Sequence, residues 1–339
     1  METVIVFAFL MMWIGYVVVR RRLFIPVLAA FNSGNYERGL LLTRRLLRVF
    51  PRDPLLLYNR GLFLAILGEE EAAQADLTQA LKRRPKFISS YIIRAYIHIR
   101  HKRYREAVQE YDAALRIDPD AAYLYTQRAT AHLRVGDLLQ AMRDVNRALE
   151  LLQSQVQKQE RFGAYIMGAA GSTNETRMML AAAYAMRAAV YNRQGSFAAS
   201  DEDYTRAASL TPDYAFLYND YAENAFTAGD YGRALDLFQQ ADTLRQNVVQ
   251  PPFHPLMQIR PLEEFTQAGT AVTHSAMGND STALDLWKRL TEKEPRYHDP
   301  DWVRSELNWP DAMIAEGRKL IDMLGNETAP PASLDSAAS

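Results

Sequence analysis

Residues 54–87 read PLLLYNRGLFLAILGEEEAAQADLTQALKRRPKF, and residues 88–121, which follow without a gap, read ISSYIIRAYIHIRHKRYREAVQEYDAALRIDPDA. The two segments have the same length of 34 residues and share residue types at matching positions. Gly61 and Ala95 are small residues at the eighth position, and Ala73 and Ala107 are alanines at the twentieth. Both segments carry proline at the thirty-second position. A fixed period near 34 residues predicts antiparallel helix pairs that stack side by side. The predicted fold class is therefore all-α.

The same period runs through most of the chain. Repeats begin at residues 20, 54, 88 and 122 without interruption, again at 181 and 215, and in a degenerate form at 264. A glycine stands at the predicted turn between the two helices in every repeat but the third, which has Lys102. These glycines are Gly34, Gly68, Gly136, Gly195, Gly229 and Gly278. Glycine readily adopts the left-handed conformation that ends a helix, so we expect the first helix of each pair to end there.

These positions resemble the tetratricopeptide-repeat family over about 240 of the 339 residues. The resemblance implies a right-handed solenoid of about seven helix-turn-helix repeats. It also implies that the first helix of each repeat, the A helix, lines a concave groove that binds proteins or peptides. Chaperone receptors of the family hold a terminal carboxylate with Lys and Asn at the fifth and ninth A-helix positions. The second repeat has Tyr58 and Leu62 there, so this clamp is absent.

An arginine at the seventh position and an acid at the twenty-third occur together in four repeats. The pairs are Arg60 with Asp76, Arg94 with Glu110, Arg128 with Asp144, and Arg187 with Asp203. The other three repeats have Pro26, Tyr221 or Thr270 at the seventh position and leucine at the twenty-third. Because charge and countercharge appear and disappear together, we predict a structural ion pair between the A helix and the second, B helix of these four repeats.

The N-terminal segment Thr3 to Val19 is an uncharged run of 17 residues, about 25 Å long as a helix and near the lower limit for crossing a bilayer. Arg20, Arg21 and Arg22 follow it directly. Basic residues beside a membrane span favour the cytoplasmic side. We therefore predict a single-pass anchor with its N-terminus outside and its repeats in the cytoplasm, where the basic flank can also meet anionic lipids. The excess of arginine over lysine hints at a bacterial source and so at the inner membrane.

Two interruptions and a terminal segment complete the predicted organisation. The insertion at 154–180 is expected to form a loop with an apolar tip followed by a longer A helix, and the four prolines of 247–261 forbid a regular helix. This proline-rich segment either bridges two repeats or lies in the groove. A final helix should cap the solenoid. The predicted regions are the anchor 1–22, repeats 23–153, insertion 154–180, repeats 181–246, linker 247–263, degenerate repeat 264–297, capping helix 298–326 and disordered tail 327–339.

Candidate partner-binding residues follow from the A-helix positions expected to face the groove. They are Tyr58, Tyr96, Arg100, Thr130, Arg134, Arg193, Asn219 and Glu223. Arg100, Arg134 and Arg193 share the thirteenth position of their repeats, which suggests a basic row for an acidic peptide or a carboxylate. Solvated surface charge explains the same row equally well.

The chain offers little sign of catalysis or cofactor binding. It has no cysteine, which excludes disulfides, thiolate metal sites and thiol nucleophiles. Three of the six histidines, His98, His132 and His274, share the eleventh repeat position and are expected to be packing residues. We therefore expect no enzyme activity, metal, cofactor, small-molecule substrate or nucleic-acid partner. Two functions remain: a scaffold that binds proteins at the cytoplasmic face of a membrane, and an integral subunit or assembly factor of a membrane complex.

Overall fold

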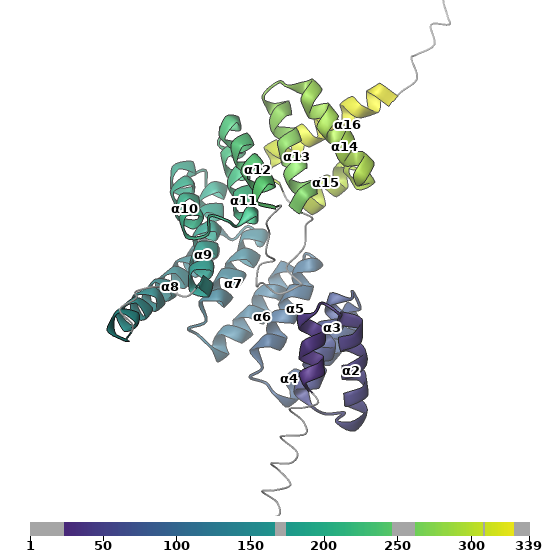
Figure 1. The fold of residues 1–339 in the computed structure, drawn as a ribbon, viewed down its shortest axis with the longest axis vertical. Coiled ribbons are helices and arrows are strands. Elements are labelled where there is room, and N and C mark those ends of the chain that lie inside the picture. The colour runs from purple at the N-terminus through teal and green to yellow at the C-terminus, as the bar shows by residue number, and fades with distance from the viewer. Residues whose placement is uncertain (1–23, 167–173, 246–261, 308, 329–339) are drawn as a thin grey trace, which may run out of the picture. The chain divides into compact units, whose positions relative to one another are not determined.

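The computed structural model describes residues 24–166, 174–245, 262–307 and 309–328. These residues form helices and turns, with no strand among them (Figure 1). The chain divides into two compact units, and the boundary within the repeats lies between Val135 and Gly136.

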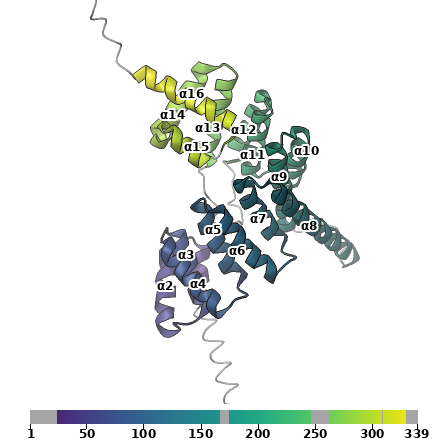
Figure 2. The same ribbon diagram turned by 180° about the vertical axis from the view of Figure 1, so that it is seen from behind.

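The first unit is a series of helix hairpins. Residues 24–32 are helical and form the A helix of the first repeat. The helices that follow are α2 (Tyr36–Val49), α3 (Pro54–Ile66), α4 (Glu70–Arg83), α5 (Ile88–Arg100), α6 (Tyr104–Ile117) and α7 (Ala122–Val135). Each helix packs against the next one along the chain, as the front and rear views both show (Figures 1 and 2).

The second unit continues the hairpins and ends in additional helices. Its elements are α8 (Leu138–Ile166), α9 (Asn174–Arg193), α10 (Phe197–Leu210), α11 (Ala215–Thr227), α12 (Tyr231–Arg245), α13 (Leu262–Ala276), α14 (Asp280–Lys293), a 3-10 turn (Pro295–His298), α15 (Pro300–Leu307) and α16 (Asp311–Thr328). One continuous apolar core runs from Ala181 to Leu324, with Phe238 and Trp287 fully buried within it.

The predicted glycine turns are confirmed. All six glycines have a positive φ, between 70° and 87°, and Lys102 takes the same conformation at φ 57°. At the third repeat the amide of Arg103 donates to the carbonyl of His98 over 2.9 Å, and the amide of Lys102 donates to that of Ile99 over 2.9 Å. This pair of hydrogen bonds satisfies carbonyls that the helix end would leave unpaired.

The small residues allow the two helices of a repeat to pack closely. A methyl group added at Gly61 would lie 3.0 Å from Cγ of Leu77 and 3.1 Å from the carbonyl oxygen of Ala73. Leu77 and Ala73 are themselves fully buried on α4. A larger side chain at Gly61 would therefore force α3 away from α4.

In the insertion at 154–180 the predicted longer A helix is confirmed as α9, while α8 occupies the start of the predicted loop. Helix α8 continues to Ile166, and α9 begins at Asn174, one to two turns earlier than the A helices of other repeats. The sequence from Glu150 to Arg161 is rich in Gln, Glu and Leu and has no glycine or proline, so it favours helix. Gln159 Nε2 donates to Thr176 Oγ1 over 3.3 Å and ties the two extended helices together.

The predicted single capping helix over 298–326 is also wrong in detail. The segment forms α15 and α16, because Pro300 starts α15 and Pro310, directly before α16, cannot continue a helix. Helix α16 packs against α13 and α14 and buries Met313 and Leu320 completely. This helix covers the apolar end of the degenerate repeat.

Three predicted regions lie wholly or mostly outside the described residues. They are the N-terminal anchor 1–22, the proline-rich segment 247–261 and the tail 327–339, of which only 327–328 are described, as the end of α16. Within the described residues no helix combines the length and apolar character needed to cross a bilayer.

Candidate partner-binding groove

Ion pairs join the A and B helices inside three of the repeats predicted to contain them. Arg187 Nε lies 2.6 Å from Asp203 Oδ2, and its Nη2 lies 2.9 Å from Oδ1, so the contact is bidentate. Arg60 contacts Asp76 in the same two-pronged way, with both distances 2.6 Å. Hydrogen bonding to these carboxylates raises the pKa of Arg187 and of Arg60. Each pair lies within one repeat, and Arg187 Nη1 also donates to Asn146 Oδ1 on α8 over 3.3 Å.

The third pair is less symmetric. Arg94 Nη2 lies 2.6 Å from Glu110 Oε1, and Nε2 of His98 lies 3.9 Å from the same oxygen. Burial raises the pKa of Glu110, and the Arg94 charge and hydrogen bond oppose this change. Burial, followed by the positive charges of Arg103 and Arg94, lowers the pKa of His98. His98 is therefore expected to be neutral near pH 7, as a packing residue should be.

The fourth pair stays a prediction. Arg128 belongs to the first unit and Asp144 to the second. Within the first unit, Arg128 Nη1 forms an ion pair with Asp112 Oδ1 on the preceding helix α6. Asp112 was not among the predicted partners.

In the sixth repeat a tyrosine replaces the arginine and forms a different polar network. The Tyr221 hydroxyl donates to Asp201 Oδ1 over 2.6 Å, and its ring stacks on Tyr204 with centroids 4.9 Å apart. Arg233 completes the network through an ion pair with Asp201 at 2.8 Å. Sequence reasoning missed this network because its acid, Asp201, belongs to the preceding fifth repeat, whereas the predicted pairs lie within one repeat.

Two groove candidates of the first unit are largely taken up by packing. Tyr96 is 8% exposed, and burial raises its pKa to about 12. The Tyr58 ring packs on Phe87 with centroids 4.8 Å apart, and burial raises the pKa of Tyr58 as well. The expectation that Tyr96 faces an open groove is therefore wrong.

Arg100 connects two repeats. Its Nη1 lies 2.8 Å from Glu70 Oε1 and donates to the carbonyl oxygen of Ala65 over 3.3 Å. His101 also contacts Glu70. Arg100 thus has partners within the first unit, which weakens its role in a basic row.

On α7 two candidates remain partly accessible. Thr130 is half-buried and its hydroxyl donates to the carbonyl of Thr126 over 3.1 Å. Arg134, one turn later, is half-buried as well. Arg100, whose side chain is 38% exposed, and the half-buried Tyr58 also keep accessible surface, so only Tyr96 of the first-unit candidates is buried.

The candidates of the second unit differ sharply in exposure. Arg193 is exposed and forms no ion pair with the described residues. Asn219 is 2% exposed and exchanges hydrogen bonds with Thr266 at 3.0 and 3.1 Å, which joins α11 to α13. Glu223 is half-buried on α11. Asn219 is therefore a structural residue and not part of an open surface.

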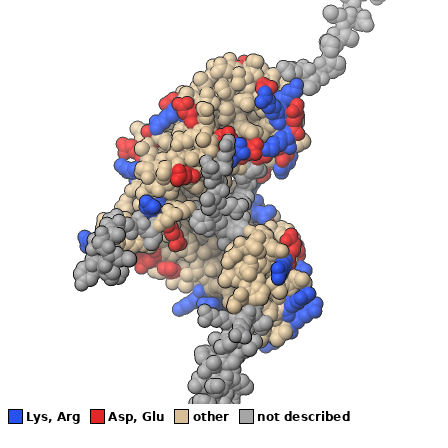
Figure 3. Space-filling model, viewed as in Figure 1, with Lys and Arg blue, Asp and Glu red and all other residues tan. Residues whose placement is uncertain are grey.

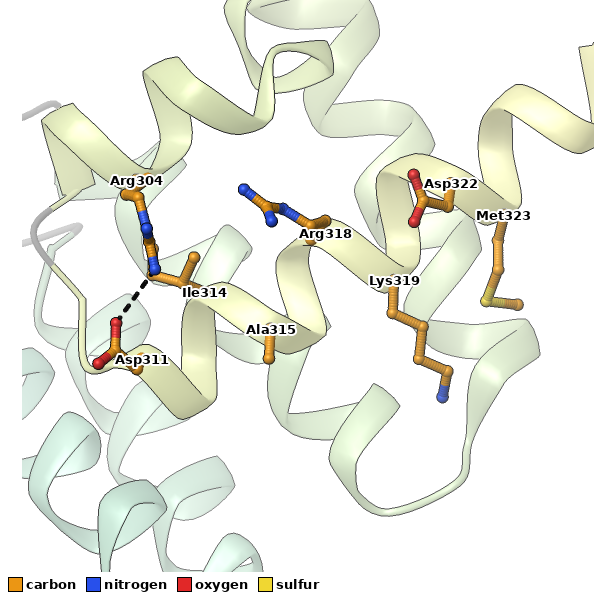
Figure 4. Close-up of a pocket in the computed structure, with 8 residues that line it drawn as sticks. All are labelled: Arg304, Asp311, Ile314, Ala315, Arg318, Lys319, Asp322 and Met323. Atoms are coloured by element: carbon orange, nitrogen blue, oxygen red, sulfur yellow. Dashed lines mark hydrogen bonds and ion pairs between the residues drawn. The ribbon is translucent and has the colours of Figure 1, made fainter.

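A shallow hollow of about 470 Å³ lies beside α15 and α16 (Figure 4). Arg304 pairs with Asp311 at 3.4 Å across one side, and Arg318 points toward the same space. Its eight lining residues have mixed charge and include no nucleophile beside a general base. Among the described residues, no three histidines or carboxylates gather in a way that could hold a metal ion.

Comparison with known proteins agrees with this architecture. Models of the tetratricopeptide repeat match residues 27–73, 67–122 and 181–214. The Hsp70-Hsp90 organizing protein of Triticum aestivum is 28% identical over 85 residues, which are 25% of this chain and 15% of that protein. The match thus spans a small part of the wheat protein.

Two solved structures share the fold at low sequence identity. A tetratricopeptide repeat protein from Parabacteroides merdae has a TM-score of 0.61 and 17% identity, over 89% of this chain and 98% of its own. PilW, a type IV pilus biogenesis factor, has a TM-score of 0.51 and 18% identity, over 71% of this chain and 94% of its own. The described residues form helix hairpins, and residues 27–122 and 181–214 match the tetratricopeptide repeat.

Proposed function

We propose that this chain is a protein-binding scaffold whose A helices hold an extended segment of a partner, and that residues 3–19 tether it to the cytoplasmic face of a membrane, in bacteria the inner membrane. The observation that carries the binding proposal is the contact between successive A helices. In the first unit α3 contacts α5, and in the second α9 contacts α11, which contacts α13. Such rows of helices present a line of side chains, which suits an extended peptide better than a small molecule.

The accessible side chains favour an acidic partner. Arg193 is exposed and forms no ion pair with the described residues, and Arg134 is a half-buried cation on α7. Guanidinium groups bind carboxylates through paired, charge-assisted hydrogen bonds. Tyr58 and Leu62 stand in place of the family's carboxylate clamp, so we expect recognition of acidic side chains along the partner and not of its C-terminus.

Photocrosslinking in intact cells tests the binding proposal. A photoreactive amino acid replaces Arg134 or Arg193 one at a time, and Gln109, exposed on the B helix α6, is the matched control position. The scaffold model expects the same protein adduct from positions 134 and 193 and none from 109. Equal labelling at all three positions would contradict a groove.

Purification in a mild detergent distinguishes the scaffold from its alternative, an integral subunit or assembly factor. If the chain is a scaffold, we expect it to purify mostly without a partner and to form only a transient complex with the partner. A stoichiometric complex that survives about 0.5 M salt, a concentration that screens exposed charges strongly, would favour the alternative.

A further inference from the structure

Two large apolar side chains of the first repeat are exposed at positions that are buried in a later repeat. Ile25 and Leu28 are 60% and 61% exposed. Their counterparts two repeat lengths further on, Ile93 and Tyr96, are 2% and 8% exposed, because α5 packs against α3 and α4. The outer face of a terminal repeat is normally polar, which keeps a repeat protein soluble. The first repeat instead presents an apolar surface.

The outer face of α2, the second helix of the same hairpin, mixes apolar and basic side chains. Leu41 is 49% exposed, and Arg38, Arg45 and Arg48 are exposed three, four and seven positions away from it. These spacings place all four on one side of the helix. None of the three arginines forms an ion pair within the described residues. Figure 3 shows basic residues along the edge of the first unit that carries α2.

The charge of this hairpin is strongly one-sided. Residues 24–52 contain five arginines and a single acid, Glu37. Only Arg44 of the five has an ion pair among the described residues, with Glu69 of the next repeat at 3.7 Å. Exposed apolar side chains among unpaired arginines are typical of surfaces that rest in the headgroup region of anionic membranes.

The sequence before the hairpin points to the same occupant. Val19 ends the uncharged run, and Phe24 begins the described chain five residues later, a span of at most about 17 Å. A second copy is a poorer occupant, because a symmetric contact would place these arginines against the same arginines of its partner.

We infer that the first repeat lies on an anionic phospholipid bilayer, with Ile25, Leu28 and Leu41 entering the headgroup region and Arg38, Arg45 and Arg48 contacting phosphate groups. The inference deepens the proposed membrane tether and rests on it for the closeness of the repeat to the bilayer.

The absence of cysteine from the chain makes a site-specific test possible. Leu41→Cys is labelled with a polarity-sensitive fluorophore in the full-length protein. Gln109→Cys is the matched control, because Gln109 is exposed at the same twenty-second position of the third repeat. Each labelled protein is mixed with vesicles of phosphatidylcholine alone or with about one third phosphatidylserine, a strongly anionic surface. A lipid-attached quencher reports contact with the bilayer, and flotation reports association of the whole chain.

The expected result is a blue-shifted and quenched signal from position 41 on anionic vesicles, and no change from position 109. The variant with Arg45→Glu and Arg48→Glu should weaken the position 41 signal more than about tenfold, since each basic residue at the surface contributes about fivefold to binding. A thermal melt confirms that this variant remains folded.

The other outcomes separate the surface from the tether. Flotation with both vesicle types but no signal from position 41 overturns the inference and leaves the tether standing. Flotation only with anionic vesicles, together with the position 41 signal, supports the surface and removes the tether. Flotation with neither type overturns both. A position 41 signal that rises with protein concentration in the absence of vesicles shows a second copy on this face and overturns the inference.

Discussion

The ion pair between Arg187 and Asp203 gives the sharpest test of how a repeat is held together. The Asp203 side chain is 2% exposed, and Arg187 meets both of its oxygens at 2.6 and 2.9 Å. Arg187→Met would leave this carboxylate buried, with Arg206 at 3.3 Å as its remaining cation. Loss of one partner of a buried pair costs about 3 to 5 kcal/mol. Arg206 is half exposed and compensates in part for the lost charge of Arg187. We therefore expect Arg187→Met to lower the free energy of unfolding by about 3 kcal/mol.

A double change should recover most of this loss. Asp203→Leu in the Arg187→Met background removes the stranded charge and copies the leucine found at the twenty-third position of three other repeats. Replacing a buried ion pair by apolar side chains of similar volume is often neutral. We expect the free energy of unfolding of the double variant to lie within about 1 kcal/mol of that of the parent chain.

Urea unfolding followed by circular dichroism measures the free energies, with the parent chain and the Asp203→Leu variant completing the cycle. The order of stability should be parent, double variant, then Arg187→Met. A double variant less stable than Arg187→Met would refute the reasoning, because it would show that the two side chains stabilise the repeat independently.

Three further changes test the turns, the packing and the half-buried His98. Lys102→Gly should raise the urea midpoint by an amount equivalent to about 0.5 to 1 kcal/mol, because a positive φ costs more for lysine than for glycine; a lower midpoint would contradict this. Gly269→Ala should destabilise by about 1 to 3 kcal/mol, since its methyl group would lie 2.3 Å from the buried Phe238 ring. Gly232→Ala is the control: the position is exposed and helical, and an added methyl group would meet only Asp230 Oδ1 at 4.0 Å, so the change should be neutral or stabilising in the same unfolding assay. Burial and nearby arginines lower the pKa of His98, so its contribution to stability is full above pH 6.5 and is lost as the pH falls. The drop in urea midpoint between pH 7.5 and pH 5 should therefore be smaller for His98→Gln than for the parent chain. An equal drop would contradict the neutral state of His98.

Some features could be predicted from the sequence because they arise within a single repeat. The turn at Gly68 needs only a residue that tolerates a positive φ, and helices on either side need only their own periodicity. The pairing of Arg60 with Asp76 joins residues 16 positions apart, and its recurrence in other repeats showed which side chains belong together.

The same reasoning failed where the pattern was interrupted. The helix-favouring residues after Glu150 extend α8, although the repeat length predicted that the helix would end. Pro310 divides the predicted capping helix, a signal that was present in the sequence but outweighed by the apolar spacing. Local helix preference decided both outcomes.

The sequence by itself determined the helix pairs, their turns and the ion pairs within repeats, since each depends on residues less than one repeat apart. Only the tertiary structure decided which A-helix residues are open to a partner. Asn219 is covered through Thr266, 47 positions away, and Arg100 is held by Ala65, 35 positions away. The physical reason is that exposure depends on what the neighbouring repeat places against a side chain. The same dependence leaves Ile25 exposed in the first repeat while Ile93, at the equivalent position, is buried.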